Sequence, residues 1–190
     1  MSIKPYWVFL IIAKAMGWNI DKEKTVEVRK SYPKDENWDK VVKIYCSKDK
    51  KSFAKIPKEY QPLMQQFLNK VIGEFVCDVI YKYTANPFIC DDIKEQCTIS
   101  DDDMVKQSCL TLDELYHYEK YPESYNWGLL GWHISNLVIY DKPKDLDCFR
   151  KPIDCHRGKD RHNCIGCWDC EIKRPPQSWY YVEELRCEGG

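Results

Sequence analysis

Long apolar runs, glycine and an excess of either charge are all scarce in this chain, and each absence excludes a class of protein. No run approaches the roughly 18–20 consecutive apolar residues that a membrane-spanning helix requires, so we expect no membrane partner. Only 8 of the 190 residues are Gly, whereas 14% are aromatic and 44% are hydrophobic, which excludes a disordered chain. We find no internal repeat and no low-complexity linker. This length and composition predict one domain, residues 1–190, with a real hydrophobic core.

The charge balance limits the kind of nucleic-acid partner. The formal net charge is −1, because 29 Lys and Arg residues nearly balance 30 Asp and Glu residues. A protein that coats duplex DNA non-specifically is usually strongly basic, so that class is disfavoured. A small pocket for one base or nucleoside remains compatible with a near-neutral chain.

The N-terminus imitates a signal peptide, with Lys4, the apolar residues 6–13 and an Ala-x-Ala site at 13–15. The apolar run is short, however, and Lys14 lies inside the supposed cleavage site. The 11 cysteines are also an odd number, which argues against a secreted disulfide framework. We therefore expect a reduced, cytoplasmic protein.

Five of the cysteines cluster in a loop that forms an insertion at about residues 146–173. Its pattern is Cys148-x6-Cys155-His156-x5-His162-Asn163-Cys164-x2-Cys167-x2-Cys170. Thiolates three residues apart in a tight loop can turn back onto one ion, as in structural Zn sites. We predict a structural Zn site whose ligands are Cys155, Cys164, Cys167 and Cys170, with Cys148, His156 and His162 in reserve. The spacing leaves open unligated cysteines or an iron–sulfur cluster.

Alternation of apolar and polar residues predicts about six strands with few helical connections. The expected strands are residues 2–6, 24–30, 41–47, 70–84, 132–140 and 178–185. This pattern favours an α+β fold with a small mixed β-barrel over a doubly wound sheet.

Two or three helices are expected beside these strands. A buried helix over residues 7–16 ends at Gly17, and a second helix begins at a capping box formed by Thr111 and Glu114. Residues 52–69 contain two prolines and predict a loop with one helical turn. The acidic run at 101–103 predicts a solvated loop.

The strand within residues 24–30 carries the charged side chains of greatest interest. Val26 and Val28 alternate with Glu27 and Arg29, so one face is apolar and the other is polar. Lys24 stands at the strand entrance. Taken alone, the pattern also fits an exposed face with a surface ion pair worth roughly 0–1 kcal/mol.

The order of these segments resembles the ASCH domain, a member of the PUA-like superfamily. An apolar helix precedes Lys-x-x-Glu-x-Arg at 24–29, and later segments resemble the phage and bacterial branch of the family. Those segments are 71–75, 132–135 and 175–179. The family's Gly turn before the Lys is replaced here by residues 21–23, Asp-Lys-Glu. The resemblance implies a PUA-like barrel with a pocket for a base, a nucleoside or an RNA end.

The resemblance assigns five residues of this chain to that pocket: Lys4, Lys24, Glu27, Arg29 and Trp132. Trp132 could stack a base, Glu27 could accept a hydrogen bond from an exocyclic amine, and Arg29 could hold a phosphate. Core packing is the alternative for Trp132. We therefore expect an RNA-binding or modified-nucleoside-binding module, with single-stranded RNA or a nucleoside as its partner.

Two other functions stay open. Small ASCH-type proteins that hydrolyse N4-acetylcytidine resemble this chain at Lys-x-x-Thr-x-Arg, where the Lys and Thr carry the acyl transfer. As an amidohydrolase this chain would use Lys24 and Glu27, but a carboxylate is a poor nucleophile toward an amide, so the sequence favours binding over catalysis. The third function is a phage-encoded interaction or regulatory protein, whose cysteine loop contacts a protein partner.

Overall fold

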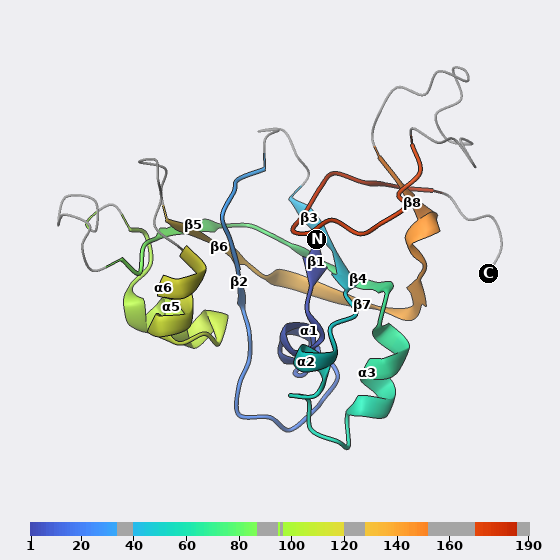
Figure 1. The fold of residues 1–190 in the computed structure, drawn as a ribbon, viewed down its shortest axis with the longest axis horizontal. Coiled ribbons are helices and arrows are strands. Elements are labelled where there is room, and N and C mark those ends of the chain that lie inside the picture. Colours follow the sequence, from blue (N-terminus) through green and yellow to red (C-terminus); the bar gives the residue numbers. More distant parts are fainter. Residues whose placement is uncertain (34–39, 87–94, 96, 120–127, 152–169, 186–190) are drawn as a thin grey trace. The chain divides into compact units, whose positions relative to one another are not determined.

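The chain forms a mixed α+β fold, seen in a computed structural model (Figure 1). The model describes residues 1–33, 40–86, 95, 97–119, 128–151 and 170–185. Contacts divide the chain into two compact units. The first comprises Met1–Phe9, Lys43–Gly73 and Ile139–Gly190, and the second comprises Leu10–Val42 and Glu74–Val138. Within the described residues, no helix has the length and apolar character needed to cross a membrane.

A four-stranded sheet has the strand order β1-β3-β4-β7. Its strands are β1 (Ser2–Ile3), β3 (Val41–Cys46), β4 (Lys70–Val76) and β7 (Ser135–Lys144). β1 runs parallel to β3, with Ser2 opposite Tyr45. A separate two-stranded sheet pairs β8 (Phe149–Arg150) with β9 (Glu183–Glu184). The first unit has its own hydrophobic cluster, which contains Tyr45, Val71, Phe149 and Ile172.

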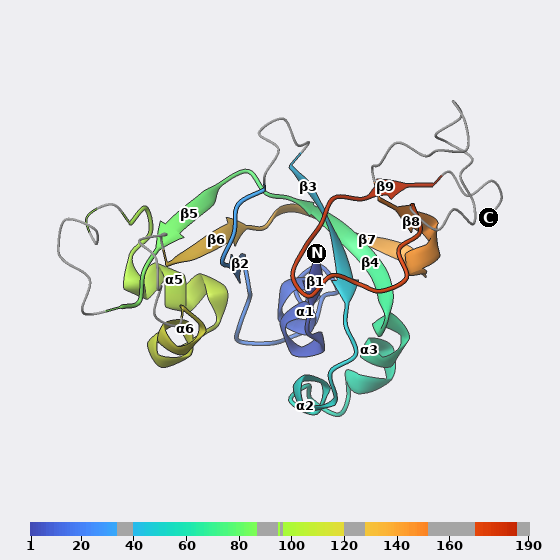
Figure 2. The same ribbon diagram turned by 45° about the horizontal axis from the view of Figure 1, so that its top comes forward.

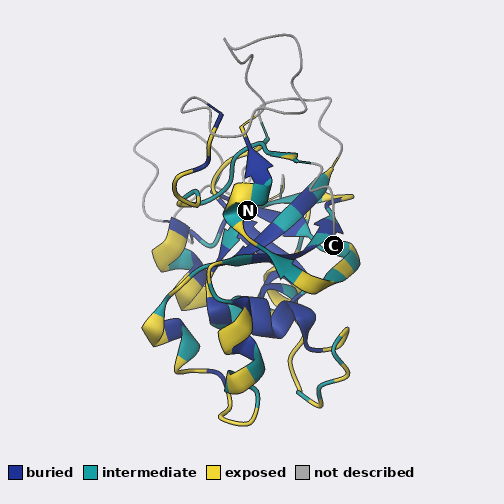
Figure 3. Ribbon diagram, turned by 90° about the vertical axis from the view of Figure 1, so that its right-hand side faces the viewer, coloured by how far each residue is buried: buried dark blue, intermediate teal, exposed yellow. Residues whose placement is uncertain are grey.

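The N-terminal helix α1 spans Pro5–Ile12 and is mostly buried, as its uniformly apolar sequence predicts (Figure 3). Proline is well suited to the first helical position, because its fixed φ is already helical and it has no N–H to leave unbonded. The predicted strand over 2–6 therefore ends at Ile3. The predicted helix over residues 7–16 differs in its bounds, because α1 ends at Ile12 and residues 13–17 form a turn, in which Gly17 has a φ of 67°.

Residues 52–69 were predicted as a loop with one helical turn, but the segment from Lys50 to Phe67 contains two helices. They are α2 (Lys50–Phe53) and α3 (Gln61–Phe67), and a short 3₁₀ turn, η1 (Leu146–Cys148), follows later in the chain. Asp49 caps α2, since its side chain accepts a hydrogen bond from the Ser52 N–H at 2.8 Å. Pro62 lies in the first turn of α3, where proline begins a helix rather than breaking one.

The second unit contains a three-stranded antiparallel sheet with two helices on one face (Figure 2). The strands, in the order β2-β6-β5, are β2 (Val26–Arg29), β6 (Leu129–His133) and β5 (Ile80–Tyr83). The helices are α5 (Asp101–Ser108) and α6 (Leu112–Glu119). Val26 and Val28 pack against Met104 of α5 and Leu115 of α6 in one cluster, which confirms the apolar face of β2.

The helix starts of the second unit follow simple capping rules. Thr111 and Glu114 form the predicted capping box, in which each side chain bonds the backbone N–H of the other residue. The acidic run at 101–103 was predicted as a solvated loop, which is wrong. It is the first turn of α5, where Ser100 is the N-cap and carboxylates favour the positive end of the helix dipole.

Three further predicted strands differ in extent from the structure. Residues 70–84 form β4 and β5, which belong to different sheets, because pairing is interrupted at residues 77–79. Residues 132–140 belong to β6 and β7, which Ile134 separates into different sheets. In the predicted final strand, residues 178–185, only Glu183–Glu184 is paired.

The α+β class is confirmed, but the predicted numbers of elements were too low. The described residues contain nine strands and five α-helices, against about six strands and two or three helices expected. Their strands pair as three sheets, and these pairings close no barrel.

Gly131, at the centre of β6, allows α5 to approach the sheet closely. A Cβ atom at this position would lie 2.9 Å from Val26 Cγ1 and 3.0 Å from Met104 Cε. Both neighbours belong to the buried cluster, so neither can move without disturbing the packing.

We expect Gly131→Ala to lower the free energy of unfolding by about 1–3 kcal/mol through overpacking. Gly17→Asn is the matched control, because no atom lies within 4 Å of a Cβ built there and Asn tolerates a positive φ. Urea unfolding of the three proteins measures both effects. Equal stability of Gly131→Ala and wild type would mean that α5 packs less closely than described.

Candidate functional site

The Lys24 ammonium is a buried charged group of the second unit. Lys24 is 3% exposed, and its Nζ donates hydrogen bonds to the carbonyl oxygens of Val26 and Ser108, both at 2.8 Å. Its third neighbour is Glu27 Oε2 at 3.4 Å. Two of its three protons are therefore donated to backbone carbonyls, and its contact with Glu27 is an ion pair.

Ser108 explains how α5 contributes to this arrangement. It is the last residue of α5, and its carbonyl is among those that a helix leaves without an intrahelical partner. The Lys24 ammonium satisfies that carbonyl and places a positive charge at the negative end of the helix dipole. One side chain therefore links the entrance of β2 to the end of a helix 84 residues away in the sequence.

Glu27, on β2, lies between the cations of Lys24 and Arg29. Its Oε1 is 2.9 Å from Arg29 Nη2, and its Oε2 is the atom that faces Lys24. Glu27 is 5% exposed and Arg29 is 8% exposed. Within the part of the chain that the structure describes, Glu27 Oε2 accepts no hydrogen bond, because the Lys24 ion pair lacks hydrogen-bond geometry.

Burial sets the electrostatics of these three residues. Loss of hydration lowers the pKa of Lys24 below its ordinary value of 10.5, while the charge of Glu27 acts in the opposite direction. A buried ion pair recovers its desolvation cost only when its hydrogen bonds are complete. The alternative of an exposed strand face with a weak surface ion pair is therefore wrong, because all four residues of β2 are buried.

Trp132 lies beside Glu27 on the neighbouring strand. The two residues are directly opposite in the pairing of β2 with β6, so their side chains project from the same face of the sheet. Trp132 is 2% exposed and ranks among the largest fully buried side chains of the described residues. The structure therefore brings Lys24, Glu27, Arg29 and Trp132 together, as a buried cluster rather than an open pocket.

Lys4, the fifth assigned residue, belongs to the first unit. Its side chain is 61% exposed, and its Nζ lies 3.9 Å from Asp49 Oδ2. His133 neighbours Trp132 in sequence but pairs with a different partner. Its Nδ1 is 2.6 Å from Asp78 Oδ1, and this hydrogen bond is the main cause of the lowered pKa of Asp78.

Sequence reasoning missed Ser108, because its contribution is a backbone carbonyl that any residue could supply. The only signal was indirect. The acidic run at 101–103 marks a helix start, and a helix start implies a helix end that needs a cation.

Of the predicted Zn ligands, Cys155, Cys164 and Cys167 lie outside the described residues, as do the reserve residues His156 and His162. Cys170 is 1% exposed, and Cys148 is half-buried. Within the described residues alone, no three metal-ligating side chains come together.

The two described edges of the cysteine loop meet at its base. The Lys151 N–H donates to the Cys170 carbonyl at 2.9 Å, and the backbones of Arg150 and Glu171 form an isolated antiparallel β-bridge. Elsewhere, burial raises the pKa of the Cys46 and Cys77 thiols to about 12, so these cysteines are unreactive core residues.

No known family model matches the chain, and no curated protein sequence is significantly similar to it. The residues and their geometry therefore carry the functional argument alone.

We expect Lys24→Met to lower the free energy of unfolding by roughly 3–5 kcal/mol, because it leaves a buried carboxylate and the Ser108 carbonyl without their cation. The double variant Lys24→Met/Glu27→Gln is the control. It also removes the charge that Lys24 balances, so it should be more stable than the single variant. Urea unfolding gives both values, and a single variant as stable as wild type would contradict this account.

The stabilities of wild type and Lys24→Met should also depend differently on pH. The pKa of Lys24 is lower in the folded state than in the unfolded state. At pH values between these two pKa values, the unfolded chain therefore binds more protons than the folded protein. The stability of wild type relative to Lys24→Met should therefore rise as the pH increases toward 10.5. Urea unfolding across the alkaline range tests the sign, and a falling difference would refute the lowered pKa.

Proposed function

We propose that this chain is an RNA- or nucleoside-binding module in which Glu27, Arg29 and Trp132 recognise one unpaired base. The observation that carries the proposal is Glu27 Oε2, a buried carboxylate oxygen that accepts no hydrogen bond within the described residues. Such an atom is incompletely satisfied, since burial removes its water and Lys24, 3.4 Å away, supplies an ion pair without hydrogen-bond geometry. A base with an exocyclic amine would supply that donor.

The neighbours of Glu27 suit the remaining parts of such a ligand. Arg29 holds Glu27 Oε1 at 2.9 Å, which fixes the carboxylate plane and leaves Oε2 as the acceptor for a ligand. Trp132 lies directly opposite Glu27 on the same face of the sheet, and its indole is a stacking surface for a base. Lys24 supports this site by holding Glu27 and the end of α5 rather than by touching the ligand.

The depth of these residues favours a small ligand contact. Glu27 and Trp132 are 5% and 2% exposed, so a long nucleic-acid backbone would not reach them, and the proposed contact is limited to a single base. With few phosphate contacts and a net charge of −1, binding should depend only weakly on salt.

The amidohydrolase alternative gains no support from the geometry. A catalytic lysine must reach its substrate, but the Lys24 Nζ is buried and donates to two backbone carbonyls, which commits it to the fold. Thr25, the nearest hydroxyl in the sequence, lines a separate cavity together with Glu23 and Cys109. We therefore favour binding over catalysis.

Glu27→Gln should weaken binding of single-stranded RNA or a nucleoside roughly 10- to 100-fold, the range expected for loss of one charge-assisted hydrogen bond. Trp132→Phe should weaken it less, because a smaller ring still stacks. Glu59→Gln, at an exposed position of the first unit, is the matched control.

The measurement is titration of RNA oligomers and free nucleosides at several salt concentrations. Binding that is steeply salt-dependent and unaffected by Glu27→Gln would place the contact elsewhere. No binding to any of these ligands would favour a protein partner instead.

We also propose that the cysteine loop holds one structural Zn ion through Cys155, Cys164, Cys167 and Cys170. Among these, Cys170 is described, and it is buried at the closed base of the loop, as a structural ligand should be. When bound, the metal would stabilise the loop and supply no catalytic step.

Elemental analysis of purified protein should find about one Zn per chain, and Cys170→Ser should reduce it. Cys109→Ser is the control, because Cys109 lies outside the loop sequence. Free thiols at all loop cysteines, with neither Zn nor Fe at a stoichiometric level, would exclude the site.

A further inference from the structure

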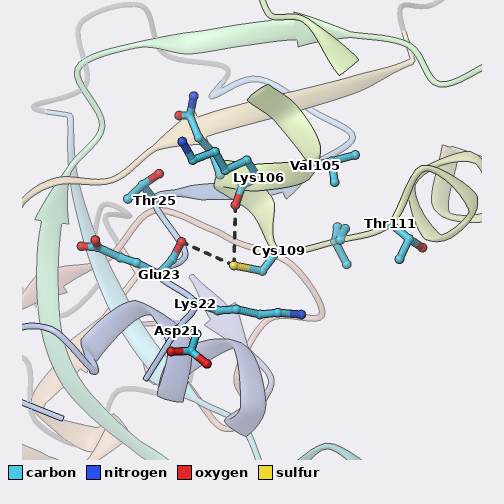
Figure 4. A pocket seen from close by; sticks show the side chains of 10 residues that line it. Asp21, Lys22, Glu23, Thr25, Val105, Lys106, Cys109 and Thr111 are labelled. Atoms are coloured by element: carbon cyan, nitrogen blue, oxygen red, sulfur yellow. Dashed lines mark hydrogen bonds between the residues drawn. The ribbon is translucent and has the colours of Figure 1, made fainter. Parts of the chain in front are cut away.

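A cavity of about 520 Å³ lies between residues 21–25 and the corner that joins α5 to α6 (Figure 4). Its volume is within the range of small-molecule sites in proteins, roughly 300–1,000 Å³. Neither Glu27 nor Trp132 lines it, so it is distinct from the base-binding site proposed above.

Hydrogen bonds join the two walls of this cavity. The Thr25 N–H donates to the Gln107 carbonyl at 2.9 Å, and the Cys109 thiol lies 3.4 Å from the Glu23 carbonyl (Figure 4). Behind the wall, Lys24 holds the Ser108 carbonyl. A cavity whose walls are already joined needs little ordering when a ligand binds, which favours affinity.

The lining combines an apolar surface with an excess of positive charge. Val105 and Leu110 contribute apolar side chains. Lys22 and Lys106 are exposed and lie on opposite sides of Cys109 in Figure 4. Few lining carboxylates oppose the charges of these two lysines.

The cavity has two lining carboxylates, Asp21 and Glu23. Glu23 is already balanced, because its Oε2 lies 3.3 Å from Lys14 Nζ. The lining therefore has two lysines, Lys22 and Lys106, against the one remaining carboxylate of Asp21. This charge balance favours a ligand with a negative group. The positions of Lys22 and Lys106 on opposite sides mean that either could meet that group.

We propose that this cavity binds a small organic anion, one that has an apolar body and a single anionic group. A nucleoside monophosphate and an aromatic carboxylate both have this chemistry. The body would lie against Val105 and Leu110, and the anionic group would meet Lys22 or Lys106. This site does not depend on the base-binding function proposed for Glu27.

Cys109 provides a direct readout of occupancy. Its side chain lines the cavity and is half-buried, so a bound ligand would cover it. Burial raises the pKa of this thiol, so alkylation is best followed at mildly alkaline pH, where the thiolate is more populated. Mass spectrometry of the peptide that contains Cys109 distinguishes its modification from that of the other ten cysteines in the chain.

The experiment measures the rate at which N-ethylmaleimide modifies Cys109 in the full chain, with and without four probes. The probes are adenosine 5′-monophosphate, 2-naphthoate, adenosine and inorganic phosphate. The first two combine an apolar body with an anionic group, and the last two each lack one of these parts. We expect adenosine 5′-monophosphate, 2-naphthoate or both to slow the reaction several-fold, and the last two to have little effect.

Variants test whether the lysines recognise the anion. Lys22→Gln and Lys106→Gln should each raise the probe concentration needed for half protection by roughly two- to fivefold, as expected for an exposed ion pair. Lys58→Gln, an exposed lysine of the first unit, is the matched control.

Three results would overturn the proposal. One is that neither adenosine 5′-monophosphate nor 2-naphthoate slows the modification of Cys109. The second is that adenosine protects as well as its monophosphate does, which would make the anion irrelevant. The third is protection that neither Lys22→Gln nor Lys106→Gln weakens.

Discussion

The Lys24 ammonium is the interaction on which the second unit depends most. It joins the entrance of β2, the carboxylate of Glu27 and the last carbonyl of α5. A single buried charge therefore fixes the position of a helix end relative to a strand. Because the ammonium is almost fully buried, its hydration has been replaced by these contacts, and loss of one of them cannot be compensated by water.

Both proposed sites are built next to this contact. On one side, Glu27 and Trp132 lie opposite each other on paired strands, with a carboxylate oxygen that needs a donor. On the other side, Glu23 and Thr25, the sequence neighbours of Lys24, line a cavity together with Cys109, the neighbour of Ser108. The two sites differ in the ligand group that they favour, a hydrogen-bond donor at Glu27 and an anion at the lysines of the cavity.

Local sequence rules predicted the features that depend on neighbouring residues. The alternation of Val26 and Val28 indicated the apolar face of β2, and Thr111 and Glu114 indicated the start of α6. The same rules failed where a polar run had more than one use. The carboxylates at 101–103 resembled a solvated loop, but beside Ser100 they begin a helix whose dipole they stabilise. The long strand over 70–84 was divided because its two parts pair in different sheets, which the local pattern does not encode.

By itself, the sequence determined the α+β class, the buried character of α1, and the set of charged residues at 24–29, because each follows from the chemistry of adjacent side chains. Only the tertiary structure decided that Lys24, Glu27 and Arg29 are buried together, that Trp132 is the cross-strand neighbour of Glu27, and that Ser108 supplies an acceptor. The physical reason is that burial and pairing are set by contacts between segments far apart in the chain. A strand pattern specifies which side chains share a face, but it does not specify what covers that face.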